Sequence, residues 1–226
     1  TRRSDSRIEK ADAHRPHVIR CSQSTGSHVN WQAPAHCKGL VFDCDGTVVD
    51  NMPLHYEAWS KTLERYGLHL EESRFYSWAG RPIADIIGQL SSEQRVSVDT
   101  QQVTQEYEHY FHSLPLHRLR PVRPVVEIAR RFRGQLPMAI ATGSTTESAS
   151  TSLQAIGVLH WFNAVISSTE SGMAKPAPDV FLAAARAIGV PARACVAFED
   201  GDLGLKGACA AGMTAVDIRP WNPRPQ

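Results

Sequence analysis

Hydrophobic residues are concentrated in short runs along the chain, and each run ends in polar residues. The runs are GLVFDC, PMAIAT, AVISS, CVAFED and AVDIR, and they begin at residues 39, 137, 164, 195 and 215. Such runs are typical of buried strands. Helical patterns lie between the later runs, over residues 145–156, 178–188 and 202–211, and each is followed by a glycine, at Gly157, Gly189 and Gly212. This alternation predicts an α/β fold, with a parallel sheet that carries helices on both faces.

A long segment without a strand pattern separates the first two runs. In PLHYEAWSKTLERYG the apolar residues recur at helical spacing until Gly67, and IADIIGQL and TQQVTQEYEHYFHSL are helical in pattern as well. RLRPVRP then contains two prolines, which favour a connection. We therefore predict a helical insert over residues 54–120, placed over the sheet edge at which the first strand ends. The core then consists of residues 39–53 and 121–226.

Residues 1–38 differ from the rest of the chain because they are rich in Arg, Ser and His and have little apolar periodicity. Arg- and Ser-rich composition is typical of an organelle-targeting leader, although Asp5, Glu9 and Asp12 are unusual in one. A disordered extension is the other interpretation. We expect the protein in the cytoplasm, or in a plastid or mitochondrion if this segment is a targeting remnant.

Composition and charge exclude several classes of function. The chain is 42% hydrophobic and 21% charged, as in ordinary globular enzymes, and its formal net charge of +1 indicates neither nucleic acid nor a membrane surface as partner. No apolar stretch approaches the roughly 18 residues of a membrane helix. The five cysteines include no C-x-x-C pair, so neither a zinc site nor a disulfide framework is indicated. Nothing in the sequence indicates the oligomeric state.

Polar residues of related chemistry stand at the ends of the predicted strands. They are Asp43, Asp45, Thr142, Gly143, Glu199 and Asp200, with Lys175 in the loop GMAKPAPD. Singly, such residues also favour turns and helix caps. Because the carboxyl ends of parallel strands meet at one edge, however, the carboxylates converge there and need a counter-ion. A hard divalent cation such as Mg²⁺ is suitable. An EF-hand is excluded because Val48 stands where that loop needs glycine.

Given a metal, these residues have roles in phosphoryl transfer. The Asp43 carboxylate can attack phosphorus and form an acyl-phosphate, and Asp45 can protonate the leaving alcohol and later take a proton from water. The Thr142 hydroxyl and the backbone amides of Gly143 and Ser144 can donate to phosphoryl oxygens. Lys175 supplies positive charge, and Glu199 and Asp200 hold the metal. Asp202 is expected to cap the helix that follows.

The order of these motifs resembles that of the haloacid dehalogenase-like superfamily. DCDGT after a strand, ATGS, KPAPD and FEDGDLG follow one another in register between residues 39 and about 219. The resemblance implies a doubly wound, Rossmann-like core with an inserted α-helical cap. KPAPDVF and VAFEDGDLGLKGACAAGM are similar to the branch of β-phosphoglucomutases and sugar phosphatases, and the overall pattern is nearest to fructose-1-phosphate-type phosphatases.

When the roles of the family's motif residues are assigned to the matching positions of this sequence, the resemblance implies that Asp43 is the nucleophile and Asp45 the general acid and base. It implies Mg²⁺ bound by Asp43, the backbone carbonyl of Asp45 and Asp200, with Glu199 in or beside the ligand set, and it makes Thr142 and Lys175 phosphate binders. His55 corresponds to a histidine at the cap hinge. In the cap segment WAGRPIADIIG, Gly80 and Arg81 are the candidates for substrate contact; the alternative is that Arg81 is a surface salt-bridge residue and His55 an ordinary polar residue of the helix.

Several functions stay open at this level. Mutases of this branch carry an arginine three residues after the cap glycine, where this chain has Ile83, so hydrolysis of a small phosphorylated substrate is favoured over phosphosugar mutation. A haloalkanoate dehalogenase would need neither Asp45 nor a metal. A non-catalytic phosphate-binding protein would be expected to have lost one of the four residues Asp43, Asp45, Lys175 and Asp200, and none is lost.

Overall fold

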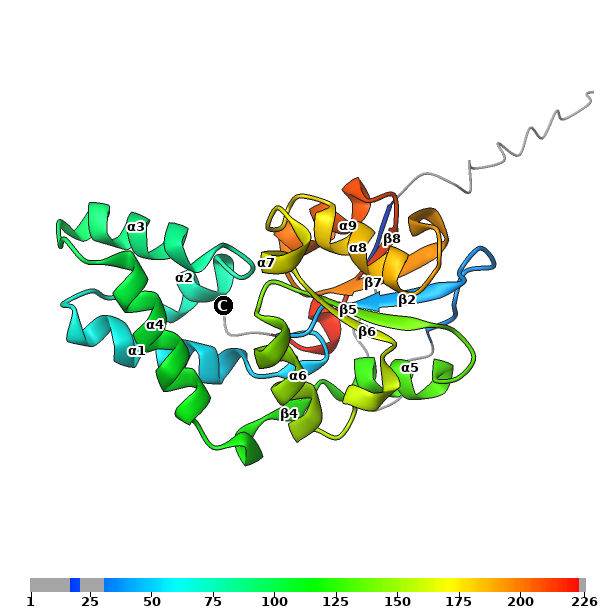
Figure 1. Ribbon diagram of the computed structural model, residues 1–226, viewed down its shortest axis with the longest axis horizontal. Helices are drawn as coiled ribbons and strands as arrows, with labels where there is room; N and C mark the ends of the chain where they lie inside the picture. Colours follow the sequence, from blue (N-terminus) through cyan, green and yellow to red (C-terminus); the bar gives the residue numbers. More distant parts are fainter. Residues whose placement is uncertain (1–16, 21–30, 224–226) are drawn as a thin grey trace, which may run out of the picture.

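A parallel sheet forms the centre of the larger of two lobes (Figure 1). The computed structural model describes residues 17–20 and 31–223. Within them the sheet is six-stranded, in the order β1-β8-β7-β2-β5-β6, and every neighbouring pair is parallel. The strands are β1 (Val18–Arg20), β2 (Gly39–Phe42), β5 (Met138–Thr142), β6 (Ala164–Ser167), β7 (Cys195–Glu199) and β8 (Thr214–Asp217). The chain crosses over between non-adjacent strands, so the predicted doubly wound α/β class is confirmed.

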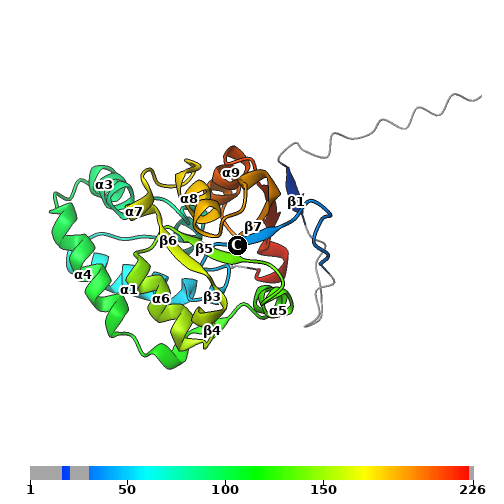
Figure 2. The same ribbon diagram turned by 45° about the vertical axis from the view of Figure 1, so that its right-hand side comes forward.

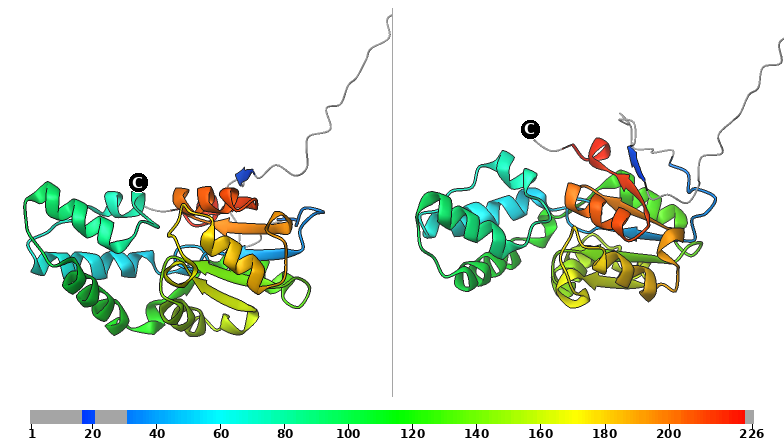
Figure 3. Two further views of the ribbon diagram at one scale, coloured as in Figure 1. Left: turned by 45° about the horizontal axis from the view of Figure 1, so that its top comes forward. Right: turned by 90° about the horizontal axis from the view of Figure 1, so that it is seen from above.

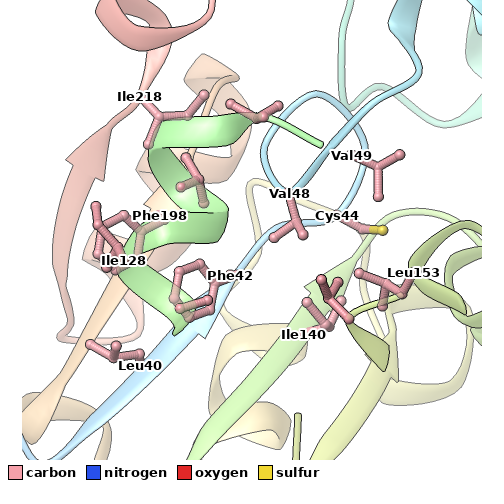
Figure 4. Close-up of a cluster of buried hydrophobic side chains, with 14 of the residues drawn as sticks. Leu40, Phe42, Cys44, Val48, Val49, Ile128, Ile140, Leu153, Phe198 and Ile218 are labelled. Carbon is pink, nitrogen blue, oxygen red and sulfur yellow. The ribbon is translucent and has the colours of Figure 1, made fainter. Parts of the chain in front are cut away.

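The two faces of the sheet are covered by different helices because side chains alternate along each strand. On one face, Leu40 and Phe42 pack against α5 (Arg123–Phe132) and α6 (Thr146–Ala155), and the Phe42 and Phe198 rings stack at a centroid distance of 4.7 Å. Figure 4 shows this cluster. On the other face, Val41 belongs to a cluster with α8 (Asp179–Ala187) and α9 (Asp202–Ala210). Strands β2, β5, β7 and β8 are thus buried on both sides, whereas the edge strands β1 and β6 are partly exposed.

The smaller lobe is the helical insert, which lies beyond one end of the sheet (Figure 3). Its helices are α1 (Met52–Arg65), α2 (Glu72–Ser77), α3 (Ile83–Gln94) and α4 (Thr100–Ser113). They bury a hydrophobic cluster of their own, which includes Trp59, Leu63, Ile87, Leu90 and Tyr107. The insert therefore has a separate core and covers the predicted edge of the sheet.

The two connections between the lobes are paired with each other. Strand β3 (Val49–Asp50) lies antiparallel to β4 (Arg120–Pro121), with Val49 opposite Pro121 and Asp50 opposite Arg120. The remaining short elements are η1 (Leu116–Arg118), η2 (Leu159–Trp161), α7 (Ser168–Ser171), η3 (Ala192–Ala194) and η4 (Arg219–Trp221). No helix of the described residues has the length and apolar character needed to cross a membrane.

The structure differs from the sequence-based expectation at the N-terminal segment. Residues 17–20 and 31–38, which we assigned to a leader outside the fold, belong to the core. Strand β1 pairs with β8 at the edge of the sheet (Figure 2), and the Trp31 ring lies against Phe198 at a centroid distance of 5.0 Å. A strand this short carries no alternation that a sequence pattern would reveal. Residues 1–16 and 21–30 lie outside the described residues.

Helix α5 was also not expected. We interpreted RLRPVRP as a connection because of its prolines, but Pro124 lies in the first turn of α5, where its missing N–H costs no hydrogen bond. Val125, Ile128 and Ala129 then form the buried face of the helix. The proline thus begins this helix and does not break it.

Candidate active site

The ends of β2 and β7 and the loop before α8 bring three ionisable groups into direct contact. The Lys175 Nζ atom lies 2.6 Å from Asp43 Oδ1, 2.6 Å from Glu199 Oε1 and 3.0 Å from the carbonyl oxygen of Ala141. Asp43, Lys175 and Glu199 are 6%, 5% and 2% exposed. The three donor positions of the ammonium group are therefore all used, and the predicted convergence of these residues is observed.

The charges of this cluster are strongly coupled by burial. Burial lowers the pKa of Lys175, but the adjacent charges of Asp43 and Glu199 outweigh this effect and hold its pKa above the ordinary value, so that it remains an ammonium group. Burial raises the pKa of Glu199 to about 8, reinforced by the charge of Asp43 and opposed by Lys175. Burial also raises the pKa of Asp43, and Lys175 opposes that rise. The single ammonium group of Lys175 therefore does not balance the carboxylates at this sheet edge.

A glycine of α9 makes room for Glu199. A Cβ atom at Gly204 would lie 2.0 Å from the Glu199 carboxyl carbon and 2.1 and 2.2 Å from its two oxygens. Real Cβ atoms do not approach so closely, so any larger residue would displace the carboxylate from Lys175. The second glycine of FEDGDLG, Gly204, is thus explained by the close approach of helix α9 to the Glu199 side chain rather than by backbone conformation.

Asp45 accepts hydrogen bonds from two segments, the start of α1 and the turn after β5, and His55 of α1 lies nearby. Asn51 Nδ2 lies 2.5 Å from Oδ1 and Ser144 Oγ lies 2.5 Å from Oδ2, while His55 Nε2 is 3.6 Å from Oδ1. Burial raises the pKa of Asp45, but His55, Ser144 and Asn51 together outweigh that effect and lower its pKa below the ordinary value. In this arrangement Asp45 is held as a carboxylate.

The turn after β5 presents the predicted phosphate-binding groups with one change. The Ser144 amide donates to Thr142 Oγ1 over 3.0 Å, so that the Thr142 hydroxyl keeps its own proton for another acceptor. Ser144 is thus engaged through both its amide and its hydroxyl, whereas we expected its amide to be available for phosphate. Beside Gly143 the space is open, because an added Cβ would meet no atom within 4 Å.

An acidic cluster at this edge suits a hard cation. Oxygen atoms of Asp43, Glu199 and Asp200 lie within 4.8 Å of one another, and this is the only such group found among the described residues. Thr47 Oγ1 donates to Asp200 Oδ1 over 3.2 Å and so orients that carboxylate. The donor set is all oxygen, and Lys175 offsets only part of the negative charge. These residues therefore fit Mg²⁺.

The cap residues named from the sequence lie at different distances from this cluster. His55 is buried on α1 beside Asp45. Gly80 belongs to a turn that touches the core, because a Cβ at Gly80 would lie 3.8 Å from Leu203 Cβ and one at Gly201 would lie 3.6 Å from the carbonyl oxygen of Ala79. The Arg81 guanidinium donates to Gln89 Oε1 over 2.8 Å and lies 4.5 Å from the centre of the Trp78 ring. Its recorded contacts are all within the cap.

Three features of the site were not anticipated. Asn51, at the N-cap position of α1, makes no side-chain cap bond and donates instead to Asp45. Tyr107 of α4 contacts His55, and the helical pattern of this segment did not single it out. Asp202 does not cap α9 as predicted: its side chain makes no cap bond, and its Oδ1 accepts from Arg219 Nη1 over 2.8 Å. A local pattern cannot distinguish a cap from a partner distant in sequence.

Comparison with known proteins agrees with this geometry. The family model described as "haloacid dehalogenase-like hydrolase" matches residues 37–212. The chain belongs to this family. This match confirms the resemblance to the family that the sequence motifs indicate. This haloacid dehalogenase-like hydrolase is 36% identical over 181 residues to fructose-1-phosphate phosphatase YqaB of Escherichia coli. The match covers 80% of this chain and 96% of that protein.

Two further similarities are more distant. The hydrolase is 24% identical over 193 residues to β-phosphoglucomutase of Bacillus subtilis, across 82% of this chain and 85% of that protein. The crystal structure of CbbY from Rhodobacter sphaeroides in complex with phosphate superposes with a TM-score of 0.72 at 19% identity, and the match covers 84% of this chain and 90% of that chain. At 19% identity, the similarity to CbbY shows the fold alone.

Proposed function

We propose that this hydrolase is a Mg²⁺-dependent phosphatase that removes phosphate from a small sugar phosphate, or a related phosphomonoester, through an aspartyl-phosphate on Asp43. The observation that supports this best is the contact of Asp43 with Lys175 at 2.6 Å, inside an acidic cluster and next to a separately anchored Asp45. A nucleophile, a proton-transfer group and a fixed positive charge then surround one point at the sheet edge.

The first half-reaction transfers the phosphoryl group to the enzyme. A carboxylate oxygen of Asp43 forms a bond to phosphorus while the bond from phosphorus to the alcohol oxygen breaks, and Asp45 gives a proton to the leaving alcohol. The Thr142 hydroxyl binds a phosphoryl oxygen, and the Lys175 donor that faces Asp43 turns to the phosphoryl group as Asp43 forms its bond to phosphorus. Mg²⁺ held by Asp43, Asp200 and the backbone carbonyl of Asp45, with Glu199 in or beside the ligand set, would supply the further positive charge that the phosphate needs.

The second half-reaction returns the enzyme to its starting state. Water attacks phosphorus, the bond between phosphorus and the Asp43 oxygen breaks, and Asp45 takes the proton from water. Asp45 gave up its proton in the first step, so it is a carboxylate that can accept this one, although its lowered pKa makes it a weak base in the free enzyme. In the first step the negative charge of the bound phosphate raises the pKa of Asp45, because a like charge disfavours ionisation, and this allows the carboxyl group to carry a proton.

The substrate class is inferred from the relatives and from the cap. A fructose-1-phosphate phosphatase covers most of this chain, so we use fructose 1-phosphate as the first probe. A phosphosugar mutase is the second candidate because of the similarity to a β-phosphoglucomutase. Ile83 argues against a mutase, because mutases of this branch have at this position an arginine that binds the second phosphate of the substrate. The Arg81 side chain is instead bonded to Gln89.

The proposal is tested by phosphate release from a panel of sugar and polyol phosphates, with Mg²⁺, with excess chelator, and with Ca²⁺ added to Mg²⁺. We expect release with Mg²⁺, loss in chelator, recovery on adding the metal back, and inhibition by Ca²⁺, which takes more ligands and disturbs the attack geometry. Full activity in chelator would contradict the metal dependence. Conversion of β-glucose 1-phosphate to glucose 6-phosphate faster than phosphate release would favour the mutase.

A further inference from the structure

The segment that follows β8 contacts both loops that carry the proposed metal ligands. The Ile218 amide donates to the carbonyl oxygen of Glu199 over 2.9 Å, in the loop after β7. The chain then turns through η4, whose Trp221 side chain is buried. Ile218 and Trp221 belong to the same hydrophobic cluster as Val48 of the turn after β2, and Figure 4 labels Ile218 and Val48 within it. The segment is therefore packed against both loops.

Arg219 attaches this segment to the loop after β7. The Asp217 carboxylate, buried at the end of β8, accepts from the Arg219 amide over 3.1 Å and from its Nε and Nη2 atoms over 2.9 and 2.7 Å. Pairing at two nitrogen atoms fixes the plane of the guanidinium. Its Nη1 atom donates to Asp202 Oδ1 over 2.8 Å. Glu199 and Asp202 flank Asp200, so the segment is bonded on both sides of that proposed ligand.

Asn222 attaches the same segment to the turn after β2. Its Nδ2 atom donates to the carbonyl oxygen of Gly46 over 3.1 Å. Gly46 has a φ of 87°, which glycine adopts without strain, and its amide donates to the Val49 carbonyl over 2.7 Å. The Asp45 carbonyl that we propose as a Mg²⁺ ligand belongs to the peptide bond on one side of Gly46. The carbonyl that Asn222 holds belongs to the peptide bond on the other side, so Asn222 fixes the turn from which the ligand comes.

The relative position of these two loops decides whether the metal site is complete. Oxygen atoms of Asp43, from the first loop, and of Glu199 and Asp200, from the second, lie within 4.8 Å of one another. Mg²⁺ requires nearly octahedral geometry with ligands at about 2.0–2.1 Å, so a small shift of one loop against the other weakens its binding. The bond from Thr47 Oγ1 to Asp200 Oδ1 joins the loops directly, but at 3.2 Å it is long for a hydroxyl donor.

We propose that Asn222 is a positioning residue for the Mg²⁺ site. Through residues 217–222 it keeps the loop that carries Asp45 in place relative to the loop that carries Asp200. Asn222 supplies none of the proposed ligand atoms and acts through the Gly46 carbonyl. The inference rests on the Mg²⁺ site of the proposed function, and it depends neither on the identity of the substrate nor on the aspartyl-phosphate.

The first experiment measures metal binding without substrate. Asn222→Leu keeps a side chain of similar size and removes the donor. We expect the Kd for Mg²⁺, measured by isothermal titration calorimetry of the metal-free protein, to rise about tenfold, at the lower end of the 10- to 100-fold that is typical for groups that orient metal ligands. Asn222→Ser, whose side chain is too short to reach Gly46, should give the same result.

The second experiment separates positioning of the metal from catalysis. In phosphate release by Asn222→Leu, the Mg²⁺ concentration that gives half the maximal rate should rise by the same factor as the Kd. At saturating Mg²⁺, kcat should stay within about twofold of wild type, because the nucleophile and the proton-transfer group are unchanged.

Asn163→Leu is the matched control. Asn163 Oδ1 accepts from the Met138 amide over 2.9 Å at the start of β5, which is the end of the sheet away from the site. This variant also loses a bond between an asparagine side chain and the main chain, but its Kd for Mg²⁺ should equal that of the wild type. Thermal unfolding of the metal-free proteins measures how much stability each variant loses.

The possible outcomes distinguish this inference from the proposed function. An unchanged Kd in Asn222→Leu, or an equal rise in Asn163→Leu, would overturn the positioning role. A wild type that binds Mg²⁺ but releases phosphate from no substrate would overturn the proposed phosphatase and leave the comparison of Kd values intact. A wild type that binds no Mg²⁺ would overturn the metal site and this role with it.

Discussion

The sheet edge and the inner side of the cap face each other across the site, yet they are built differently. At the edge, Asp43, Lys175 and Glu199 are buried and bonded to one another. On the cap, the Arg81 side chain is directed to Gln89 and His55 Nε2 has no hydrogen bond among the described residues. The first region is bonded across neighbouring strands, while the second is bonded within the cap and leaves one nitrogen of His55 without a hydrogen bond among the described residues.

This difference follows from how each region is supported. The edge is formed by the ends of adjacent strands β2, β5 and β7, which are packed on both faces. The cap has its own core and joins the sheet domain through the short β3–β4 pair. Rigid groups suit the bond-making steps, and an element that can shift suits the choice of substrate and the exclusion of water.

The largest expected effect tests whether the edge alone carries the chemistry. Asp43→Asn should lower kcat for phosphate release by at least about 10³-fold with little change in thermal stability, because an amide is nearly isosteric but not nucleophilic. Phosphate release and thermal unfolding measure the two quantities. Asp85→Asn, an exposed aspartate of α3, is the control and should retain activity. Retention of more than about a tenth of wild-type turnover in Asp43→Asn would contradict the covalent mechanism.

The same glycine substitution in the two lobes should have opposite results. Gly204→Ala forces the Glu199 carboxylate away from Lys175, so we expect at least about a tenfold weaker apparent affinity for Mg²⁺ and a loss of stability of about 1–3 kcal/mol. Gly88→Ala in α3 meets no atom within 4 Å and should stabilise the protein by about 0.5–1 kcal/mol. Denaturant unfolding and Mg²⁺ titration of activity test both. A neutral Gly204→Ala would mean that the edge is not rigid.

The cap should affect which substrate is used more than how fast a generic one reacts. Arg81→Ala is expected to change relative kcat/KM among sugar phosphates by about tenfold, or about 1.4 kcal/mol, and to leave p-nitrophenyl phosphate nearly unchanged. Arg74→Ala is the matched control, since Arg74 also lies over Trp78 but pairs with Glu93. An equal loss on every substrate would assign Arg81 to general structure, and no change on any would make it a surface residue.

A smaller effect is expected when the thermal stability of the metal-free protein is measured at different pH values. The pKa of Glu199 is raised to about 8, so the folded state binds this proton more tightly than the unfolded state. Stability contributed in this way is present at low pH and is lost as pH rises towards about 8. Mg²⁺ displaces the proton, so its stabilising effect should grow over the same range, by about 2–4 °C in Tm between pH 6 and pH 9. Thermal unfolding with and without Mg²⁺ measures this, and a gain that is constant with pH would contradict it.

The sequence predicted those features that repeat or that lie together along the chain. The buried strand at Gly39–Phe42 and the carboxylates after it follow from a local pattern, and so does the convergence of strand ends. Pro124 was misinterpreted because the same residue can begin a helix or interrupt one. Asn51 and Tyr107 could not be found, since their contacts with Asp45 and His55 depend on how the cap lies on the sheet, which no local pattern encodes.

The pairing of β3 with β4 also bears on how such a molecule can be remodelled. Asp50 and Arg120 are opposite each other, so the chain leaves the sheet domain and returns to it at a single point. An insertion whose two ends meet imposes no stretch on the host, which is the condition under which whole segments are exchanged without loss of fold. Residues 51–119 are thus a natural unit for grafting: a related cap joined at this point should bring a new substrate preference while the register of every strand in the sheet stays the same.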